Sequence, residues 1–206
     1  MSAGRSRVAP VGLAVMAAVA LGACGSSDDP AGRGMMPGTT ASPSGTAPAA
    51  DHGQADVMFS MMMVPHHEQA VEMSALVPSR SEDPELRELA AAIADAQQPE
   101  IEQMQGWLRG WGVAAPGDMA GHMGHMGMDG MLSAAELEEL ESLRGPAFER
   151  TWLQGMVRHH EGAIDMAEQV LEDGVHEPTR ALARTIITTQ QAEITAMQEM
   201  LAGAEG

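Results

Sequence analysis

The sequence carries one motif twice, at a constant offset of 93 residues: MVPHHE at residues 63–68 and MVRHHE at residues 156–161. Residues 56–109 can be laid over residues 149–202 at this offset without a gap, which gives 54 pairs, of which 19 are identical. A fixed offset over that length indicates a duplicated structural unit. Histidine and methionine, both metal-ligand types, are among the identical positions. The duplicated unit is therefore expected to carry the chemistry.

The beginning of the chain has the features of a secretory signal. Arg5 and Arg7 precede an apolar stretch at residues 8–21, which is too short to be identified as a spanning helix and is followed by small residues. The letters LGAC at residues 21–24 resemble a bacterial lipobox, whose cysteine is lipidated and becomes the first mature residue. Cys24 is the only cysteine in the chain. We therefore expect residues 1–23 to be a lipoprotein signal peptide, in preference to an ordinary signal peptide with an incidental cysteine.

Composition separates a tether from a folded domain. Residues 24–55 are rich in Gly, Ser, Pro, Thr and Ala, so they are expected to form a disordered tether, with one domain over residues 56–206. Without the signal, nine arginines and no lysine face 29 acidic residues, a formal charge of −20. Such a surface excludes nucleic acid, which needs basic patches, and favours cations.

Helical signals account for the whole domain, and strand signals are absent. Capping residues, helix-opening prolines and terminal glycines predict five helices: from Asp56 to Val77, ended by Pro78; from Pro84 to about Gly110; from Ser133 to about Leu143; from Pro146 to Gly174; and from Pro178 to Gly203. The prediction is an all-α four-helix bundle. It consists of two repeated hairpins, residues 56–109 and 149–202, joined by one long Met/His-rich crossover at residues 113–145.

In a helical-wheel projection, both histidines of each motif lie on the face expected to point into the bundle. His66 and His67 share an apolar stripe, whereas Glu68 points outward, and Glu100 lies on the apolar face of the next helix. A carboxylate inside a bundle costs several kcal/mol unless it is paired or bound to a metal, and the facing histidines are its partners. The alternative is a hydrogen-bonded network without metal; we favour metal because histidine is a frequent ligand.

The predicted ligands follow from the same wheel in both repeats. They are His66, His67, Met63, Met73 and Glu100 in the first repeat, and His159, His160, Met156, Met166 and Glu193 in the second, with Gln97, Gln190, Met104 and Met197 beside them. The wheel assigns Glu68 and Glu161 to a solvated face, which leaves their role open. Met58 and Met200 are expected to fill core volume.

The crossover contains a methionine excess that core packing does not explain. Its glycine-rich sequence has no helical stripe, yet it holds Met119, His122, Met123, His125, Met126, Met128 and Met131. Thioether with imidazole is a soft ligand set suited to Cu(I) or Ag(I). The alternative is a low-complexity linker that happens to be rich in methionine.

The doubled motif resembles the family called domain of unknown function 305, with its Met-x-x-His-His-x-x-Ala-x-x-Met signature at residues 63–73 and 156–166. The later Gln-Gln-x-Glu-Ile element, at residues 97–101 and 190–194, supports the resemblance, which covers about residues 56–202. The resemblance implies a ferritin-like fold and copper binding or resistance in the cell envelope, with the histidine pairs and motif methionines as ligands. It attaches no firm enzymatic activity to the chain.

Together these features predict a lipoprotein on the extracytoplasmic face of the membrane, anchored through Cys24. It would bind copper as Cu(I) for sequestration, resistance or transfer to a copper-accepting protein. A ferritin-like di-iron oxidase is one alternative, but that site needs Glu-x-x-His motifs, which the chain lacks. A non-catalytic envelope interaction module is the other. No catalytic residue set is apparent, so an enzyme is not expected.

Overall fold

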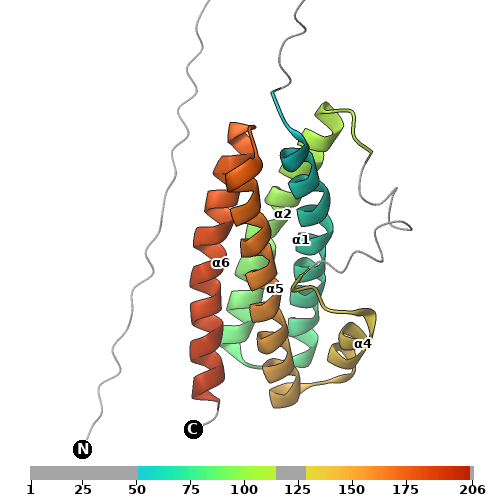
Figure 1. Cartoon of the computed structure of the whole chain (residues 1–206). Coiled ribbons are helices and arrows are strands. Elements are labelled where there is room, and N and C mark those ends of the chain that lie inside the picture. The colour runs from blue at the N-terminus through green and yellow to red at the C-terminus, as the bar shows by residue number, and fades with distance from the viewer. Residues whose placement is uncertain (1–50, 115–128, 205–206) are drawn as a thin grey trace, which may run out of the picture. The chain divides into compact units, whose positions relative to one another are not determined.

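The computed structural model describes residues 51–114 and 129–204, and within these ranges it consists of helices and short irregular connections, without strands. The helices are α1 (Gln54–Arg80), α2 (Pro84–Gly110), α4 (Ala134–Ser142), α5 (Gly145–Asp173) and α6 (Glu177–Gly203) (Figure 1). The all-α prediction is confirmed. The signal peptide, Cys24, most of the tether and crossover residues 115–128 lie outside the described residues.

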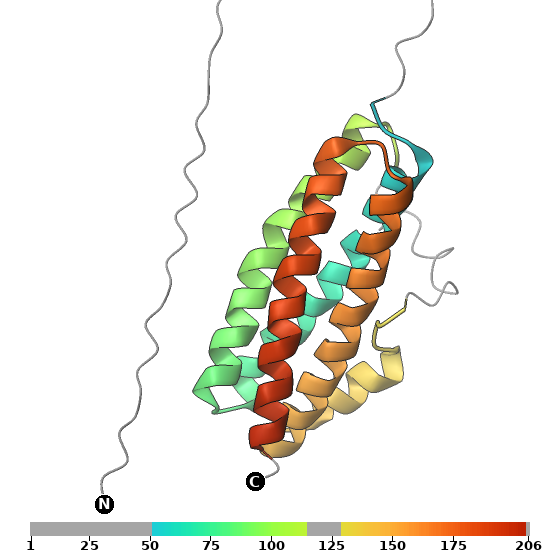
Figure 2. The same ribbon diagram turned by 60° about the vertical axis from the view of Figure 1, so that its left-hand side comes forward.

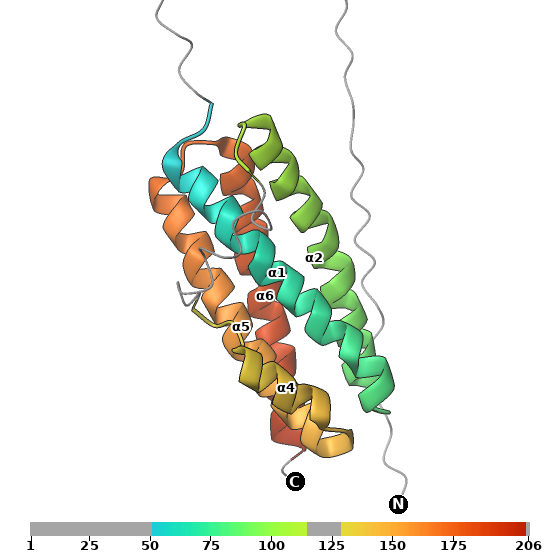
Figure 3. The same ribbon diagram turned by 90° about the vertical axis from the view of Figure 1, so that its right-hand side faces the viewer.

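Four long helices lie side by side, and α4 lies across the end of α1 and α5 (Figures 2 and 3). The hairpins α1–α2 and α5–α6 are the two repeats. Helices α1 and α5 run antiparallel, because Asp56 at the start of α1 bonds to Val175 beyond α5, whereas Trp152 near the start of α5 bonds to Met73 late in α1. Helices α2 and α5 therefore point the same way, which requires a connection as long as the bundle.

The predicted helix ends are found at most positions, and both exceptions are in α1, which begins at Gln54 and so includes the last two residues of the predicted tether. Asp83 caps α2 by accepting hydrogen bonds from the Glu85 and Leu86 amides, and Ser133 with Glu136 forms the capping box of α4. The prediction that α1 ends at Pro78 is wrong, since it continues to Arg80. Proline removes only its own bond to the preceding turn, and the Ser81 amide still reaches the Val77 carbonyl at 3.0 Å.

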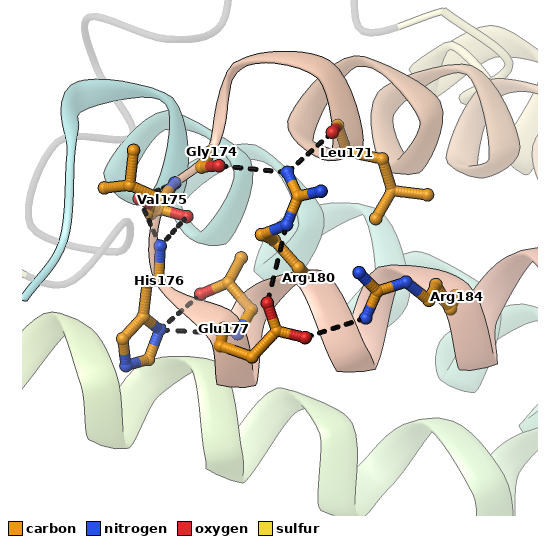
Figure 4. A network of polar contacts seen from close by, with 9 residues as sticks. Leu171, Gly174, Val175, His176, Glu177, Arg180 and Arg184 are labelled. Carbon is orange, nitrogen blue, oxygen red and sulfur yellow. Dashed lines mark hydrogen bonds and ion pairs between the residues drawn. The ribbon is translucent and has the colours of Figure 1, made fainter.

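Matching arginines close the two hairpins. In α2, Arg87 donates from Nε to the Ser81 carbonyl at 2.7 Å and from a terminal nitrogen to the Pro78 carbonyl at 3.1 Å. Its repeat equivalent, Arg180, donates to the Gly174 and Leu171 carbonyls at 3.0 and 2.6 Å (Figure 4). Each arginine therefore satisfies carbonyls at the C-terminus of the preceding helix, where a positive charge also complements the helix dipole.

Replacing Arg180 with alanine is expected to lower the free energy of unfolding by about 1–2 kcal/mol, because charge-assisted bonds to two carbonyls are lost. Arg184→Ala is the matched control. Arg184 bonds only to exposed Glu177, and its side chain is 51% exposed, so its removal should cost less than about 0.5 kcal/mol. Urea unfolding followed by circular dichroism measures both. Equal losses would contradict the role of Arg180 at the hairpin.

The core consists of two apolar clusters, one toward each end of the bundle. The cluster near α4 includes Trp152 and Phe148, both fully buried, and the Trp152 indole N–H donates to the Met73 carbonyl at 2.9 Å. Met200 packs partly buried against it, but the expectation that Met58 fills the core is wrong: this residue is 40% exposed. Among the described helices, none is long and apolar enough to span a membrane.

Candidate metal centre

The two histidine pairs meet at the contact between α1 and α5. His66, His67, His159 and His160 are all fully buried. The rings of His66 and His159 lie 3.8 Å apart between centroids, and those of His159 and His160 lie 6.3 Å apart. The duplication therefore brings one pair from each repeat into a single histidine centre, defined here by these four side chains.

Each repeat also supplies one carboxylate to the histidine centre. His67 Nε2 and Glu100 Oε2 are 2.8 Å apart, and His160 Nε2 and Glu193 Oε2 are also 2.8 Å apart. The pairing is the one that the helical wheel predicts, across α1–α2 in one repeat and across α5–α6 in the other. The glutamate side chains are only 16% and 14% exposed, so both bonds are largely shielded from water.

These partners determine which ring nitrogens carry protons. A carboxylate or carbonyl oxygen only accepts, so the rings of His67 and His160, in the neutral form in which histidine binds a metal, donate from Nε2 to their glutamates, and His66 donates from Nε2 to the Asp129 carbonyl at 3.3 Å. Each ring then keeps a lone pair on Nδ1. All three Nδ1 atoms are buried without a hydrogen-bond partner, as are both ring nitrogens of His159. Orphaned lone pairs of this kind, on rings oriented from the other nitrogen, are typical of metal ligands.

Burial keeps the adjacent rings uncharged. Burial, together with the nearby His67, lowers the pKa of His66 to about 3. Burial also lowers the pKa of His159 well below its usual value, with contributions from His66, His160 and His67. Protonating either ring would place a cation in an apolar core beside three other imidazoles. His66 and His159 therefore present neutral nitrogen ligands over the whole physiological pH range.

The arrangement does not form a site with many convergent ligands. Within residues 51–114 and 129–204, no three side chains of histidine, cysteine, aspartate or glutamate are placed so that they could hold one ion. The amide groups of Gln97 and Gln190 face the interior with unpartnered atoms. The described histidines and carboxylates therefore do not form a cage of four to six ligands of the kind that zinc or calcium prefers.

The structure divides the predicted methionine ligands between the two core clusters, whereas the prediction grouped them by repeat. Met63 and Met104 are fully buried in one core cluster, whereas Met73, Met156 and Met197 are fully buried in the other. The motif methionines of the two repeats, Met63 and Met156, thus lie in different clusters. The repeat equivalent of Met73 is Met166, which is only partly buried and lines a surface cleft.

Other predicted residues lie on the surface or outside the described residues. Glu68 and Glu161 are exposed, as the wheel predicts, and Glu68 accepts a 3.4 Å hydrogen bond from Gln105. The crossover ligands at positions 119–128 fall outside the described residues, and Met131, which is described, is partly buried.

Sequence reasoning missed that the part of the crossover at residues 129–132 closes over the centre. The Asp129 carbonyl accepts from His66, and the Gln69 amide makes two hydrogen bonds with the Leu132 backbone, at 2.9 and 2.8 Å. The repeat alignment contained a signal: Gln69 is paired with Gly162 inside the otherwise similar motif. The asymmetry is structural, because Gly162 leaves room for the backbone that Gln69 holds.

Replacing Gly162 with alanine is expected to displace this segment, because the added Cβ would lie 2.0 Å from the Asp129 carbonyl oxygen. Overpacking of this kind costs about 1–3 kcal/mol of stability. Gly106→Ala is the control: its Cβ would lie 3.9 Å from the nearest atom, so the helix should gain up to about 1 kcal/mol. Urea unfolding measures both changes. Loss of the His66–Asp129 bond should also appear as a shift of the His66 Nε2 signal in ¹⁵N NMR.

Fold and centre together define a duplicated four-helix bundle with paired histidines in its core. The family model described as "Domain of unknown function (DUF305)" matches residues 56–201, and the chain belongs to this family. A DUF305 protein from Streptomyces coelicolor, classed as secreted, has a similar structure, with 37% identity and a TM-score of 0.67 over 77% of this chain and 97% of that one.

The protein CopM also has this fold. Its Cu(II)-bound form is 32% identical with a TM-score of 0.63, covering 72% of this chain and 96% of that one. Its Cu(I)-bound form is 28% identical with a TM-score of 0.61, covering 73% of this chain and 98% of that one. The uncharacterized protein L153 of Acanthamoeba polyphaga mimivirus is 41% identical over 49 residues, which is 24% of this chain and about a third (32%) of that protein's length.

Proposed function

We propose that this chain binds copper as Cu(I) at the histidine centre, as cargo for sequestration or transfer rather than as a catalytic cofactor. The observation that carries the proposal is the set of buried ring nitrogens without hydrogen-bond partners. Each unpartnered polar atom in a core costs free energy, and a bound ion would recover it. A purely structural network would be expected to satisfy these nitrogens within the protein.

The ligand chemistry favours a monovalent soft ion. Imidazole and thioether are the donors available inside the bundle, with Met63 and Met156 one helical turn before the histidines, and both suit Cu(I). Cu(I) accepts two or three ligands, which agrees with the absence of a larger convergent ligand group in the described residues. A di-iron oxidase would need carboxylates free to bridge two metals, but Glu100 and Glu193 are each bonded to a histidine.

The relatives support the same metal. CopM, which has this fold, has been crystallised in Cu(I)-, Cu(II)- and Ag-bound forms. Silver resembles Cu(I) in charge and softness. From these relatives the proposal takes only the class of metal, a soft ion. It assigns this class to the present chain because of the chain's own histidines and methionines.

The proposal places the bundle outside the cytoplasm, where copper is encountered. Cys24 would carry the lipid anchor, residues 24–53 would act as the tether, and the crossover would collect Cu(I) through the methionines and histidines at positions 119–131. A negative surface with no lysine attracts cations over distance. A copper-accepting protein would be the downstream partner.

Competitive titration with a Cu(I) chelator, together with metal analysis of the purified chain, tests the proposal. We expect bound copper in the full chain and loss of its tightest site when all four histidines of the centre are replaced by glutamine. A second variant, with the crossover methionines changed to leucine, should keep that tightest site and lose only copper ions that bind more weakly. Unchanged stoichiometry in both variants would refute copper binding. Two irons per chain with oxygen consumption would support the oxidase instead.

A further inference from the structure

The cleft between α1 and α5 near the start of α1 is lined by three methionines. It has a volume of about 470 Å³, and Met58 and Met62 line it from α1 while Met166 lines it from α5. We call these three side chains the methionine cleft. Because α1 and α5 run antiparallel, the early part of α1 faces the late part of α5. The cleft therefore lies at the same helix contact as the histidine centre, but on the surface.

Packing alone does not explain this group. Met58 is 40% exposed, so this large apolar side chain gains little stability from packing at its position on the helix surface. Met58 and Met62 are four residues apart, so they occupy successive turns on one face of α1. The duplication does not explain the group either, because the equivalent positions in the second repeat are Thr151 and Gly155. The cleft is thus an addition to one side of a repeated scaffold.

The chemistry of the lining selects a class of ligand. Thioether sulfurs are neutral and soft, so they bind Cu(I) and Ag(I) and have little affinity for hard cations. Asp173 also lines the cleft and supplies a negative charge beside the sulfurs. No histidine or cysteine lines it, so a divalent transition metal would lack its preferred ligands. Thioethers also do not titrate, so their ability to bind a metal is independent of pH.

We propose that the methionine cleft is a second, surface site for a soft monovalent metal ion, held by the sulfurs of Met58, Met62 and Met166. The site is independent of the histidine centre and stands whether or not the buried imidazoles bind copper. Its position on the surface gives an arriving ion direct access, whereas the histidine centre is closed to solvent.

Silver titration of the full chain labelled with ¹³C in its methionine methyl groups tests this site, because each methionine reports separately. The resonances of Met58, Met62 and Met166, assigned by single leucine substitutions, should shift together and saturate at one common silver concentration. The variant Met58→Leu/Met62→Leu/Met166→Leu should bind one silver ion fewer in a competition titration. Leucine keeps the cleft apolar, so a loss of binding is attributable to the sulfurs.

Met200→Leu is the matched control, because Met200 is also partly buried but lines clefts that contain no other methionine. It should leave the silver stoichiometry unchanged. Met58→Leu alone changes an exposed side chain, so it tests the site even if the triple variant folds poorly. Unmoved resonances at the three cleft methionines, or full stoichiometry in folded leucine variants, would overturn the proposal. Capture of an apolar peptide by the wild-type chain and by the triple variant alike, without silver binding, would identify the cleft as a docking groove.

Discussion

The metal-free chain is expected to lose stability steeply as the pH falls below 6.5. In the unfolded chain His66 binds a proton near its ordinary pKa of 6.5, whereas in the folded chain burial holds its pKa at about 3. Between these values the unfolded state binds more protons, so the free energy of unfolding decreases as the pH falls. At about pH 4.5 the loss from His66 alone is about 3 kcal/mol. His159, whose pKa is also lowered by burial, adds to the loss in the same direction.

Urea unfolding between about pH 7.5 and about pH 4.5 measures this dependence. The control is His66→Gln/His159→Gln, which keeps polar side chains of similar size that do not titrate. Carboxylates contribute equally to both proteins, so the difference between the two pH profiles isolates the histidines. Profiles of equal slope would show that the two rings are not held neutral by burial. The expected difference also has a functional consequence, because the same neutral rings are the proposed metal ligands.

Helical periodicity was sufficient to predict which histidines are buried. At 3.6 residues per turn, His66 and His67 lie on the interior face of the helix and Glu68 lies outside it. The structure buries both histidines and exposes Glu68. The same reasoning placed Glu100 and Glu193 against the histidine pair of their own repeat, and the structure shows that the partners are His67 and His160. These contacts form within one hairpin, where a short turn fixes the register of the two helices.

Contacts between the hairpins were beyond sequence reasoning. The sequence suggested one ligand set in each repeat, but the packing of α1 against α5 puts His66 next to His159 and combines the pairs. The Asp129 carbonyl enters from a segment outside the duplication. The same segment brings Leu132 close to Gly155 and into the core cluster of Met73, so identical methionines at positions 73 and 166 have different environments. A helical wheel contains no information about either effect.

Removing the histidine pair of either repeat is expected to abolish wild-type Cu(I) affinity at the centre, rather than to leave half of the sites intact. The rings of His66 and His159 are 3.8 Å apart, so an ion at one pair lies within reach of the other. Two monovalent ions about 4 Å apart would repel each other by about 4 kcal/mol at an effective dielectric constant near 20, so the centre should hold one tight ion per chain.

The variants are His66→Ala/His67→Ala and His159→Ala/His160→Ala, in a background where the methionines of the crossover and of the methionine cleft are leucine. Competitive Cu(I) titration should show each to bind at least about tenfold more weakly than the parent, which is at least about 1.4 kcal/mol. The control Glu68→Gln/Glu161→Gln alters the exposed acids next to the same histidines and should change affinity less than about twofold. Circular dichroism establishes that each variant is folded. Two ions in the parent, with one retained at full affinity in each pair variant, would instead mean that the duplication made two independent sites.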